Sequence, residues 1–371
     1  MAEAQGEADV DAFRADLRAW LGEHLTPEVV EAGERHMEGG ALEVQRAWNR
    51  TLADGGWAAP AWPVEFGGRG AGVGAQLVYL EEMSRARAPG PVNVIGVSNI
   101  APAIMRFGTP EQQQRFLQPM LRGDEIWSQG MSEPDAGSDL ASLRTAAVQD
   151  GDDFVLNGQK TWNSLGHHAD WCQLYVRTDP TAKKHAGISC FLVDMRTPGI
   201  EARPITTMTG DHTFAELYFT DARIPGSAML GPLHGGWTVA MTTLSFERAG
   251  VARLHLSLAR RLDDLLSDPR AAMGRTDPVL RDRLARIYAS IRVMRHLTER
   301  SLADSSEAAG ALGSLAKLSW AYCDQELGNL AVDLIGPDAL GAADRWADNF
   351  LAVRQASIAG GTTEINKNIV G

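Results

Sequence analysis

The sequence predicts an α+β protein made of a helical domain, a β domain and a second helical domain, in that order. Apolar residues recur every three or four positions in the first third of the chain. Short runs of β-forming residues, separated by Gly, Pro and Asp, fill the stretch between residues 127 and 231. Helical periodicity then returns after residue 235. We therefore expect an N-terminal helical domain over 1–125, a middle β-barrel or sandwich over 126–234, and a C-terminal four-helix bundle over 235–371.

The first domain is predicted to be helical because its apolar residues form a stripe and its helix boundaries are marked. Pro27 interrupts the stripe. Further helical patterns occupy 76–87 and 111–121, and Thr109-Pro110 is a favourable start for the second of these helices. Residues 55–68 hold too many Gly and Pro to be helical. The stripe itself consists of Val10, Phe13, Leu17, Leu21 and Leu25.

The middle domain is predicted to be β-structured from several short segments with turn residues between them. Residues 154–162 have the pattern of a β-hairpin, with Asn157-Gly158 as its turn. Three further strands are expected at 172–176, 188–193 and 214–219. Their length and spacing leave open whether they close into a barrel or pack as a sandwich.

The last domain is predicted from a long apolar stripe and from two glycine-containing breaks. Gly336-Pro337 should end one helix, and Gly360-Gly361 should interrupt another just before Thr362. The stripe alternates steps of four and three, which is typical of a helix in a bundle, and it contains Leu280, Leu284, Ile287, Ile291, Met294 and Leu297.

The composition excludes several classes of protein. The formal net charge of −12 provides no basic surface for nucleic acid or anionic lipid. The three cysteines form neither a C-x-x-C pair nor a metal-binding spacing, which suits a reducing compartment. The acidic first residues lack the chemistry of a leader, and no apolar run approaches the length of a membrane span. We expect a cytoplasmic protein that acts without nucleic acid or membrane.

The most informative segment runs from Trp127 to Asp139, with the sequence Trp-Ser-Gln-Gly-Met-Ser-Glu-Pro-Asp-Ala-Gly-Ser-Asp. Pro134 restricts one φ angle, Gly137 permits a positive one, and the aspartates can hydrogen-bond their own backbone. Such a turn presents amide and hydroxyl donors that could hold a flat, polar heterocycle. Taken alone, it would equally suit a surface turn between two secondary elements.

Six motifs in a fixed order resemble the acyl-CoA dehydrogenase family, and together they cover almost the whole chain. Each is weak alone, but their common order is specific. They are Gly56-Trp57 with Glu65-Phe-Gly-Gly68, Phe107-Gly-Thr-Pro-Glu-Gln-Gln112, Glu133-Pro-Asp-Ala-Gly-Ser-Asp139, Asn157-Gly-Gln-Lys160 with Trp162 and Ser164, Ile224-Pro-Gly-Ser-Ala-Met-Leu-Gly231, and Gly360-Gly-Thr-Thr-Glu-Ile365.

The resemblance implies an FAD enzyme that removes a proton from Cα and a hydride from Cβ of an acyl-CoA thioester. Electrons would then pass to an electron-transfer flavoprotein. A turn rich in amides and hydroxyls suits this chemistry, because a flavin needs donors near N1, O2 and N5. Ser138 would line the CoA side of the same loop. Matched by position, the residues in contact with FAD would be Gln129, Met131, Ser132, Trp162, Ser164, Thr362 and Glu364.

The catalytic base departs from the commonest family pattern. Many members carry Glu directly before the Gly-Thr of the closing turn, but this chain has Gly360, which can donate its N–H to the thioester carbonyl and cannot accept a proton. A second family pattern, Leu-x-x-Glu-Arg, matches Leu244-Ser-Phe-Glu247-Arg248. Glu247 is therefore the predicted base. Arg248 either pairs with a nearby carboxylate or orients Glu247.

The segments that bind the adenosine half of FAD in homotetrameric members fit poorly. Residues 268–278 lack the expected Phe-Gly and Gln, with Arg275 retained as a candidate phosphate contact. Residues 333–339 lack the later paired glycines. This combination resembles actinobacterial α2β2 heterotetramers that act on steroid side-chain CoA esters. We therefore predict a second homologous subunit that completes the flavin site, and a bulky or branched acyl group accommodated beside Gly360.

Two other functions remain open at this point. The same fold could serve an acyl-CoA oxidase or a flavin monooxygenase, or the chain could be a catalytically silent companion subunit. No metal is expected, because His167-His168 has no further ligands at metal spacing. Residues 67–70 are interpreted as a structural turn, and Trp57 and Trp62 as packing residues of the first domain.

Overall fold

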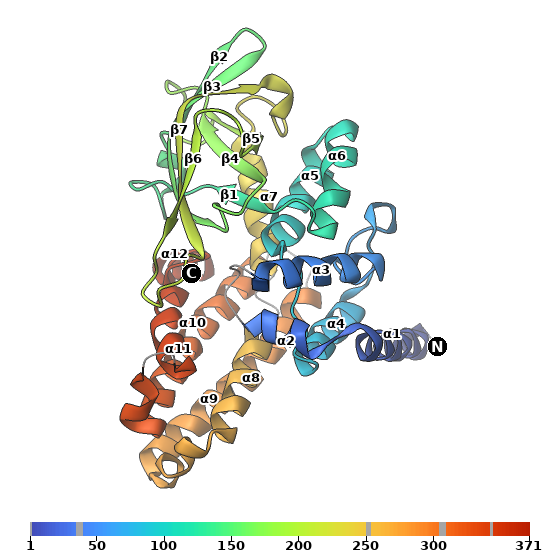
Figure 1. Cartoon of the computed structure of the whole chain (residues 1–371), viewed down its shortest axis with the longest axis vertical. Helices are drawn as coiled ribbons and strands as arrows, with labels where there is room; N and C mark the ends of the chain where they lie inside the picture. The colour runs from blue at the N-terminus through green and yellow to red at the C-terminus, as the bar shows by residue number, and fades with distance from the viewer. Residues whose placement is uncertain (1, 35–39, 250–253, 304–308, 342–343) are drawn as a thin grey trace. The chain divides into compact units, whose positions relative to one another are not determined.

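The computed structural model describes residues 2–34, 40–249, 254–303, 309–341 and 344–371, without the side chains of 2–8, 247–249, 301–303 and 309–310 (Figure 1). The chain divides into two compact units. The first contains residues 1–76 and 86–246, and the second contains 77–85 and 247–371. None of the described helices is both long and apolar enough to cross a membrane.

The N-terminal part of the first unit is helical, as predicted. Leu17 and Leu21, from the predicted stripe, are buried. Thr109 caps α6, because its hydroxyl accepts from the Gln112 amide (3.2 Å) while the Gln112 side chain accepts from the Thr109 amide (3.1 Å). The helices are α1 (Ala2–His24), α2 (Pro27–Glu34), α3 (Gly40–Asp54), the beginning of α4 (Val73–Arg85), the π-helical turn η2 (Ile95–Ile100), α5 (Ala101–Phe107) and α6 (Pro110–Arg122).

The glycine-rich segment between α3 and α4 is a structural turn, as expected. A Cβ at Gly68 would lie 2.0 Å from the carbonyl oxygen of Trp62, so only glycine fits there. The Arg69 guanidinium lies 3.5 Å from the centre of the Trp57 ring and also donates to the Gly55 carbonyl (2.7 Å). Trp57 and Trp62 are both buried. The backbone amides of residues 67–70 all donate to carbonyls of residues 60–64, so they are not available to hold a phosphate.

Seven strands form one sheet in the order β1-β4-β2-β3-β7-β6, with β5 paired to β4. The predicted strands at 172–176, 188–193 and 214–219 correspond to β4, β5 and the first half of β7. Apolar side chains from β2, β3, β4, β5 and β7 form one buried cluster. The strands are β1 (Trp127–Gly130), β2 (Ala146–Asp150), β3 (Asp153–Ser164), β4 (Trp171–Arg177), β5 (Ile188–Asp194), β6 (Ile200–Ile205) and β7 (Phe214–Pro225).

The predicted hairpin turn at Asn157-Gly158 is wrong. Strand β3 continues through both residues, and the chain turns instead at Gly151-Asp152, between β2 and β3. The register against β7 shifts at this point, and Gly158 has a φ of +146°. The Asn157 side chain exchanges two 3.0 Å hydrogen bonds with Asp221 of β7. A glycine that permits positive φ can make a β-bulge as readily as a turn, and here it makes the bulge.

Helix α7 (Gly236–Ala249) packs against the sheet. The Thr243 hydroxyl lies 3.1 Å from the Tyr175 hydroxyl and 3.3 Å from the Gln173 amide nitrogen, both on β4. A Cβ at Gly236 would lie 2.5 Å from the Ser189 carbonyl carbon, so the start of α7 lies directly on β5. Residues of α7 up to Phe246 accordingly belong to the first unit, although the sequence grouped them with the last domain.

The second unit is a helical bundle. Ile287, Ile291 and Met294 of the predicted stripe are buried against apolar residues of α8 and α10. Gly336, at a φ of +78°, ends α10 where the sequence predicts a break. Residues 77–85 of α4 also belong to this unit. Its other helices are α8 (Leu254–Ser267), α9 (Pro278–Ala303), α10 (Ala309–Ile335), α11 (Arg345–Ala352) and α12 (Thr363–Val370).

Candidate active site

In the first unit, the end of β1 and the loop after it are bonded to the end of β3. The Thr161 amide donates to the Ser132 carbonyl (2.9 Å), and the Asn163 side-chain amide donates to the Gln129 carbonyl (2.5 Å). These bonds place residues 129–132 beside residues 161–164. The structure thus brings together the first-unit residues expected to contact a flavin, which are Gln129, Met131, Ser132, Trp162 and Ser164.

A buried ion pair holds this loop in place. Lys160 of β3 is 0% exposed, and its ammonium donates to the Glu133 carboxylate (2.9 Å) and to the Met131 carbonyl (3.0 Å). Glu133 also accepts from the Arg144 and Thr145 amides, at 2.7 and 2.8 Å. Burial alone would raise the pKa of Glu133, but Lys160 and these donors hold that pKa below its usual value. The loop is therefore fixed from inside the sheet.

Trp162 has an unusual backbone and an unusual environment. Its φ is +61°, which is uncommon for a bulky residue, and it lies where the β3–β7 register shifts between Lys160 and Asn163. The side chain is 60% exposed, and the Phe214 ring lies 5.9 Å away in an edge contact. A strained backbone that presents a large apolar ring to solvent is typical of a ligand-binding position.

Two buried polar atoms beside the loop have no partner in the described part of the chain. These atoms are Gln129 Nε2 and Asn163 Oδ1. The Gln129 oxygen already accepts from the Asn99 side chain (3.4 Å), so its amide nitrogen remains available. Because an orphaned buried donor is costly, a bound polar group is expected to satisfy it. The donors, the acceptor and the exposed ring fit the edge and face of a flavin.

The outer part of the loop is a tight turn. Glu133 and Ala136 exchange two backbone hydrogen bonds, of 2.9 and 3.1 Å. Asp139 pairs with Lys184, and Ser138 is exposed beside it. Gly137 does not adopt the positive φ that the sequence permits. The predicted role of Ser138 on the CoA side stays a prediction.

In the second unit, the closing turn contains two consecutive glycines at positive φ, with +65° at Gly360 and +87° at Gly361. The Gly361 carbonyl accepts from the Lys317 ammonium (2.7 Å) and from the Asn366 side chain (2.8 Å). Thr362 then caps α12, because its hydroxyl accepts from the Ile365 amide (3.3 Å). Glu364, in the first turn of α12, is exposed.

Lys317 was missed by sequence reasoning. It lies in the buried stripe of α10 and is 3% exposed, and burial lowers its pKa while Glu364 opposes the shift. The sequence does contain a signal, because Lys317 is a charged residue at a core position of an apolar helix. Such a charge needs a partner, but the pattern does not reveal that the partner is a carbonyl of the closing turn.

For three other predicted residues, the structure shows no contact that bears on the predicted role. The backbone of α7 reaches Ala249, so Glu247 and Arg248 lie in its last turn, but their side chains lie outside the described part of the chain. Arg275 donates to the Leu266 carbonyl of its own chain. Their roles as base, orienting residue and phosphate contact stay predictions. Within the described residues, no group of three His, Cys, Asp or Glu could hold a metal ion.

Family models cover nearly the whole chain. The N-terminal, middle and C-terminal domains of acyl-CoA dehydrogenase match residues 7–124, 128–222 and 234–371. The chain belongs to the acyl-CoA dehydrogenase family. Its helical–sheet–helical plan is the architecture of that family, so the predicted fold class is confirmed.

Individual members of the family are similar over their full length. The chain is 40% identical to the acyl-CoA dehydrogenase IpdE1 of Mycobacterium tuberculosis, over 98% of this chain and 96% of that protein. Among solved structures, the steroid ACAD Tcur3481–Tcur3483 superposes with a TM-score of 0.85 at 31% identity, over 98% of this chain and 96% of that one. The ChsE4–ChsE5 complex from Mycobacterium tuberculosis superposes with a TM-score of 0.80 at 31% identity. The match again covers 98% of this chain and 96% of that one.

The family match also bears on the cofactor. Members of this family are acyl-CoA dehydrogenases, and the family implies a flavin cofactor, which the orphaned atoms beside Trp162 fit. Two of the similar structures are complexes of two named chains.

Proposed function

We propose that this chain is a catalytic subunit that introduces a double bond between Cα and Cβ of an acyl-CoA thioester. The observation that supports it most is the first-unit loop, fixed by Lys160 and Glu133 beside the exposed, positive-φ ring of Trp162. FAD, when bound there, supplies the acceptor for the hydride from Cβ. Gln129, Met131, Ser132 and Ser164 orient its ring through amide and hydroxyl groups.

The chain's own residues carry the proton transfer. Glu247 accepts the Cα proton, with Arg248 orienting its carboxylate. The Gly360 N–H donates to the thioester carbonyl and stabilises the charge that develops on that oxygen. Lys317 supports this step, because its bond to the Gly361 carbonyl helps to set the direction of the peptide groups in the closing turn.

The substrate and the partner follow from the relatives and from the altered adenosine segments. We propose a bulky, ring-bearing acyl group, since one of the similar structures is a steroid ACAD. A second homologous subunit completes the flavin site in an α2β2 assembly, where Arg275, Thr362 and Glu364 contact FAD and Ser138 contacts CoA. An electron-transfer flavoprotein in the cytoplasm takes the electrons.

We further propose that the chain has three domains, over residues 1–125, 126–234 and 235–371.

Anaerobic flavin reduction tests this function. The chain is co-expressed with a homologous subunit, and the bleaching of flavin absorbance is followed after mixing with a ring-bearing acyl-CoA. Glu247→Gln should slow the reduction by about 10²–10⁴-fold, the usual contribution of a general base. Glu23→Gln is the matched control, because Glu23 is exposed on α1. Equal rates in all three proteins would contradict Glu247 as the base and favour a silent companion subunit.

The oxidase alternative has a separate readout. Stoichiometric hydrogen peroxide in air, with no dye reduction under anaerobic conditions, would replace the dehydrogenase by an oxidase. A hydroxylated product would indicate a monooxygenase. We expect neither product.

A further inference from the structure

Three buried polar side chains join helix α7 to strand β4 within the first unit. The Thr243 hydroxyl of α7 lies 3.1 Å from the Tyr175 hydroxyl and 3.3 Å from the Gln173 side-chain nitrogen. All three residues are 0% exposed. Because these groups are closed off from water, a lost partner is not replaced by solvent. Hydrogen bonds are directional, so they hold the helix in one position on the strand more strictly than apolar packing does.

This network lies next to the strand that leads into the proposed flavin loop. In the parallel pairing of β4 with β1, Gln173 is directly opposite Gln129, which is one of the predicted flavin contacts. Neighbouring strands of a sheet lie about 5 Å apart. Helix α7 is therefore bonded to the immediate neighbour of a strand that carries a proposed flavin contact.

Thr243 also lies one turn before the proposed base. Helix α7 is continuous from Gly236 to Ala249, and Glu247 follows Thr243 by four residues. At the start of the helix, Gly236 lies directly on Ser189 of β5. The close contact at the start and the Thr243 hydroxyl, about 10 Å further along the axis, together fix the direction of the helix.

A small change in this direction is expected to affect proton transfer. Glu247 lies about 16 Å along the axis from Gly236, so a tilt of about 5° about the start of α7 moves the Glu247 Cα by about 1.4 Å. A displacement of about 1 Å can slow a reaction by about a hundredfold. Loss of the Thr243 hydroxyl would free the far end of the helix without removing the packing that forms it.

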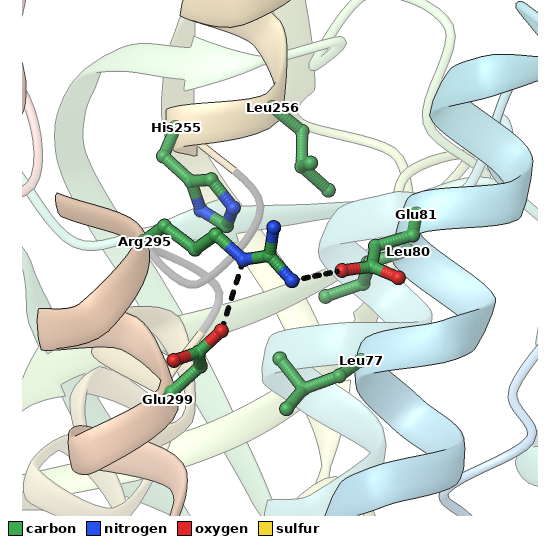
Figure 2. Close-up of a pocket in the computed structure, with 7 residues that line it drawn as sticks. All are labelled: Leu77, Leu80, Glu81, His255, Leu256, Arg295 and Glu299. Atoms are coloured by element: carbon green, nitrogen blue, oxygen red, sulfur yellow. Dashed lines mark hydrogen bonds and ion pairs between the residues drawn. The ribbon is translucent and has the colours of Figure 1, made fainter. Parts of the chain in front are cut away.

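The link between α4 and α9 in the second unit shows why burial matters for such a role. Arg295 of α9 donates to Glu81 of α4 (3.0 Å) and to Glu299 (2.9 Å) beside a small pocket (Figure 2). The Arg295 side chain is 41% exposed, so water can replace a lost carboxylate at little cost. Thr243 has no such access to water, and its bonds to β4 therefore constrain the helix more strongly.

We propose that Thr243 is a positioning residue for the removal of the Cα proton. Its hydroxyl, held by Tyr175 and Gln173, fixes the turn of α7 that precedes Glu247. The inference rests on the proposed dehydrogenase function, in which Glu247 is the base, and it adds the residue that keeps the base in place.

Anaerobic flavin reduction tests the proposal, with the co-expressed complex and a ring-bearing acyl-CoA. Thr243→Val removes the hydroxyl and keeps the shape of the side chain, so the rate at saturating substrate should fall by about tenfold or more. The half-saturating substrate concentration and the dissociation constant of FAD should change by less than about twofold. Thr243→Ser retains a hydroxyl and should recover most of the rate. Thr238→Val is the matched control, because Thr238 is exposed on the same helix.

A double variant separates positioning from a general loss of structure. If Thr243 acts through Glu247, adding Thr243→Val to Glu247→Gln should slow the reduction by less than about twofold more, because the effects of residues that act as a unit do not add. An equal slowing in both backgrounds would make Thr243 a structural residue only and would overturn the proposal. An unchanged rate in Thr243→Val, or a rate in Thr243→Ser as low as in Thr243→Val, would also overturn it.

A second variant covers the case in which Thr243→Val loses its FAD. Tyr175→Phe then takes its place in the same comparison, because it removes one of the two partners and keeps the ring. We expect about a threefold slowing from the loss of one hydrogen bond, and an unchanged rate would overturn the proposal. Failure of the proposed function looks different. The native complex would then reduce no flavin with any acyl-CoA, or Glu247→Gln would be as fast as the native protein.

Discussion

Two buried lysines, one in each unit, each donate to a carbonyl of one functional turn. They differ in whether a carboxylate balances the buried positive charge. Lys160 donates to the Met131 carbonyl (3.0 Å) below the proposed flavin loop, and Lys317 donates to the Gly361 carbonyl (2.7 Å) in the closing turn. Lys160 also has a carboxylate partner, Glu133, at 2.9 Å. Within the described residues, Lys317 forms no ion pair of this kind.

This difference indicates different mechanical roles. The first turn is anchored by a charge pair whose members are both enclosed, so it can move only if the pair breaks or moves with it. The second turn is held by one charge-assisted bond and by the Asn366 amide. We therefore expect the flavin loop to be a rigid platform, while the closing turn depends on Lys317 mainly for its direction.

The largest expected effect is on stability, in the first unit. Glu133→Gln should lower the free energy of unfolding by about 3–5 kcal/mol, because it leaves the buried Lys160 ammonium without a counter-charge. Urea unfolding measures the change. The double variant Glu133→Leu with Lys160→Met should recover a large part of it, since no buried charge then remains. A loss below about 1 kcal/mol in Glu133→Gln would mean that the pair is not an anchor.

The corresponding change in the second unit should affect catalysis more than stability. Lys317→Met keeps an unbranched side chain, one atom shorter than that of lysine, and leaves Asn366 bonded to the Gly361 carbonyl. We expect less than about 1 kcal/mol of lost stability and about a tenfold fall in kcat, with KM changed less, because the turn loses its direction. The exposed Lys183→Met is the control. A large stability loss with kcat intact would remove the contrast between the lysines.

The smallest expected effect is a difference in pH dependence. The folded pKa of Glu133 lies below its unfolded value, so the unfolded chain binds more protons as the pH falls through this range. The contribution of Glu133 is thus complete above its usual pKa of 4.5 and is lost as the pH falls towards its lower folded value. The stability difference between native protein and Glu133→Gln should shrink in that window. A difference that is constant with pH would contradict the pKa shift.

Lys317 should behave in the opposite range. Burial lowers its folded pKa below the unfolded value, so the unfolded chain binds more protons in the alkaline window between them. The cost of burying this ammonium is full at lower pH and falls as the pH rises through the folded pKa. The stability gap between the native protein and Lys317→Met should therefore move in favour of the native protein in that window.

The sequence predicts what local patterns can determine. Periodic apolar residues, the Thr109 cap and the strand segments are local signals, and the order of elements follows from them. Asn157-Gly158 failed because the same dipeptide serves a turn or a bulge, and the choice depends on Asp221, which is 64 residues away. Lys317 and its partner Gly361 are 44 residues apart in the sequence. Residues 77–85 of α4 belong to the second unit although more than a hundred residues separate them from the rest of it. Such pairings arise from topology, which periodicity does not encode.

The residues of the proposed flavin site can be picked out from the sequence largely because they lie within recognisable motifs. What the motifs do not contain is the reason that the loop keeps its shape. Glu133 and Lys160 belong to two separate motifs, and only the fold shows that their side chains meet inside the sheet. The unpaired Gln129 amide likewise depends on what surrounds it.

The most direct test of this account is the dissociation constant of FAD from the co-expressed complex with native, Trp162→Ala and Trp162→Phe chains. If the fixed first-unit turn presents Trp162 to the flavin ring, Trp162→Ala should weaken FAD binding by about tenfold or more, equal to about 1.4 kcal/mol, and Trp162→Phe should recover a substantial part. An unchanged dissociation constant in Trp162→Ala, with normal stability, would contradict the claim that this turn is where the flavin ring binds.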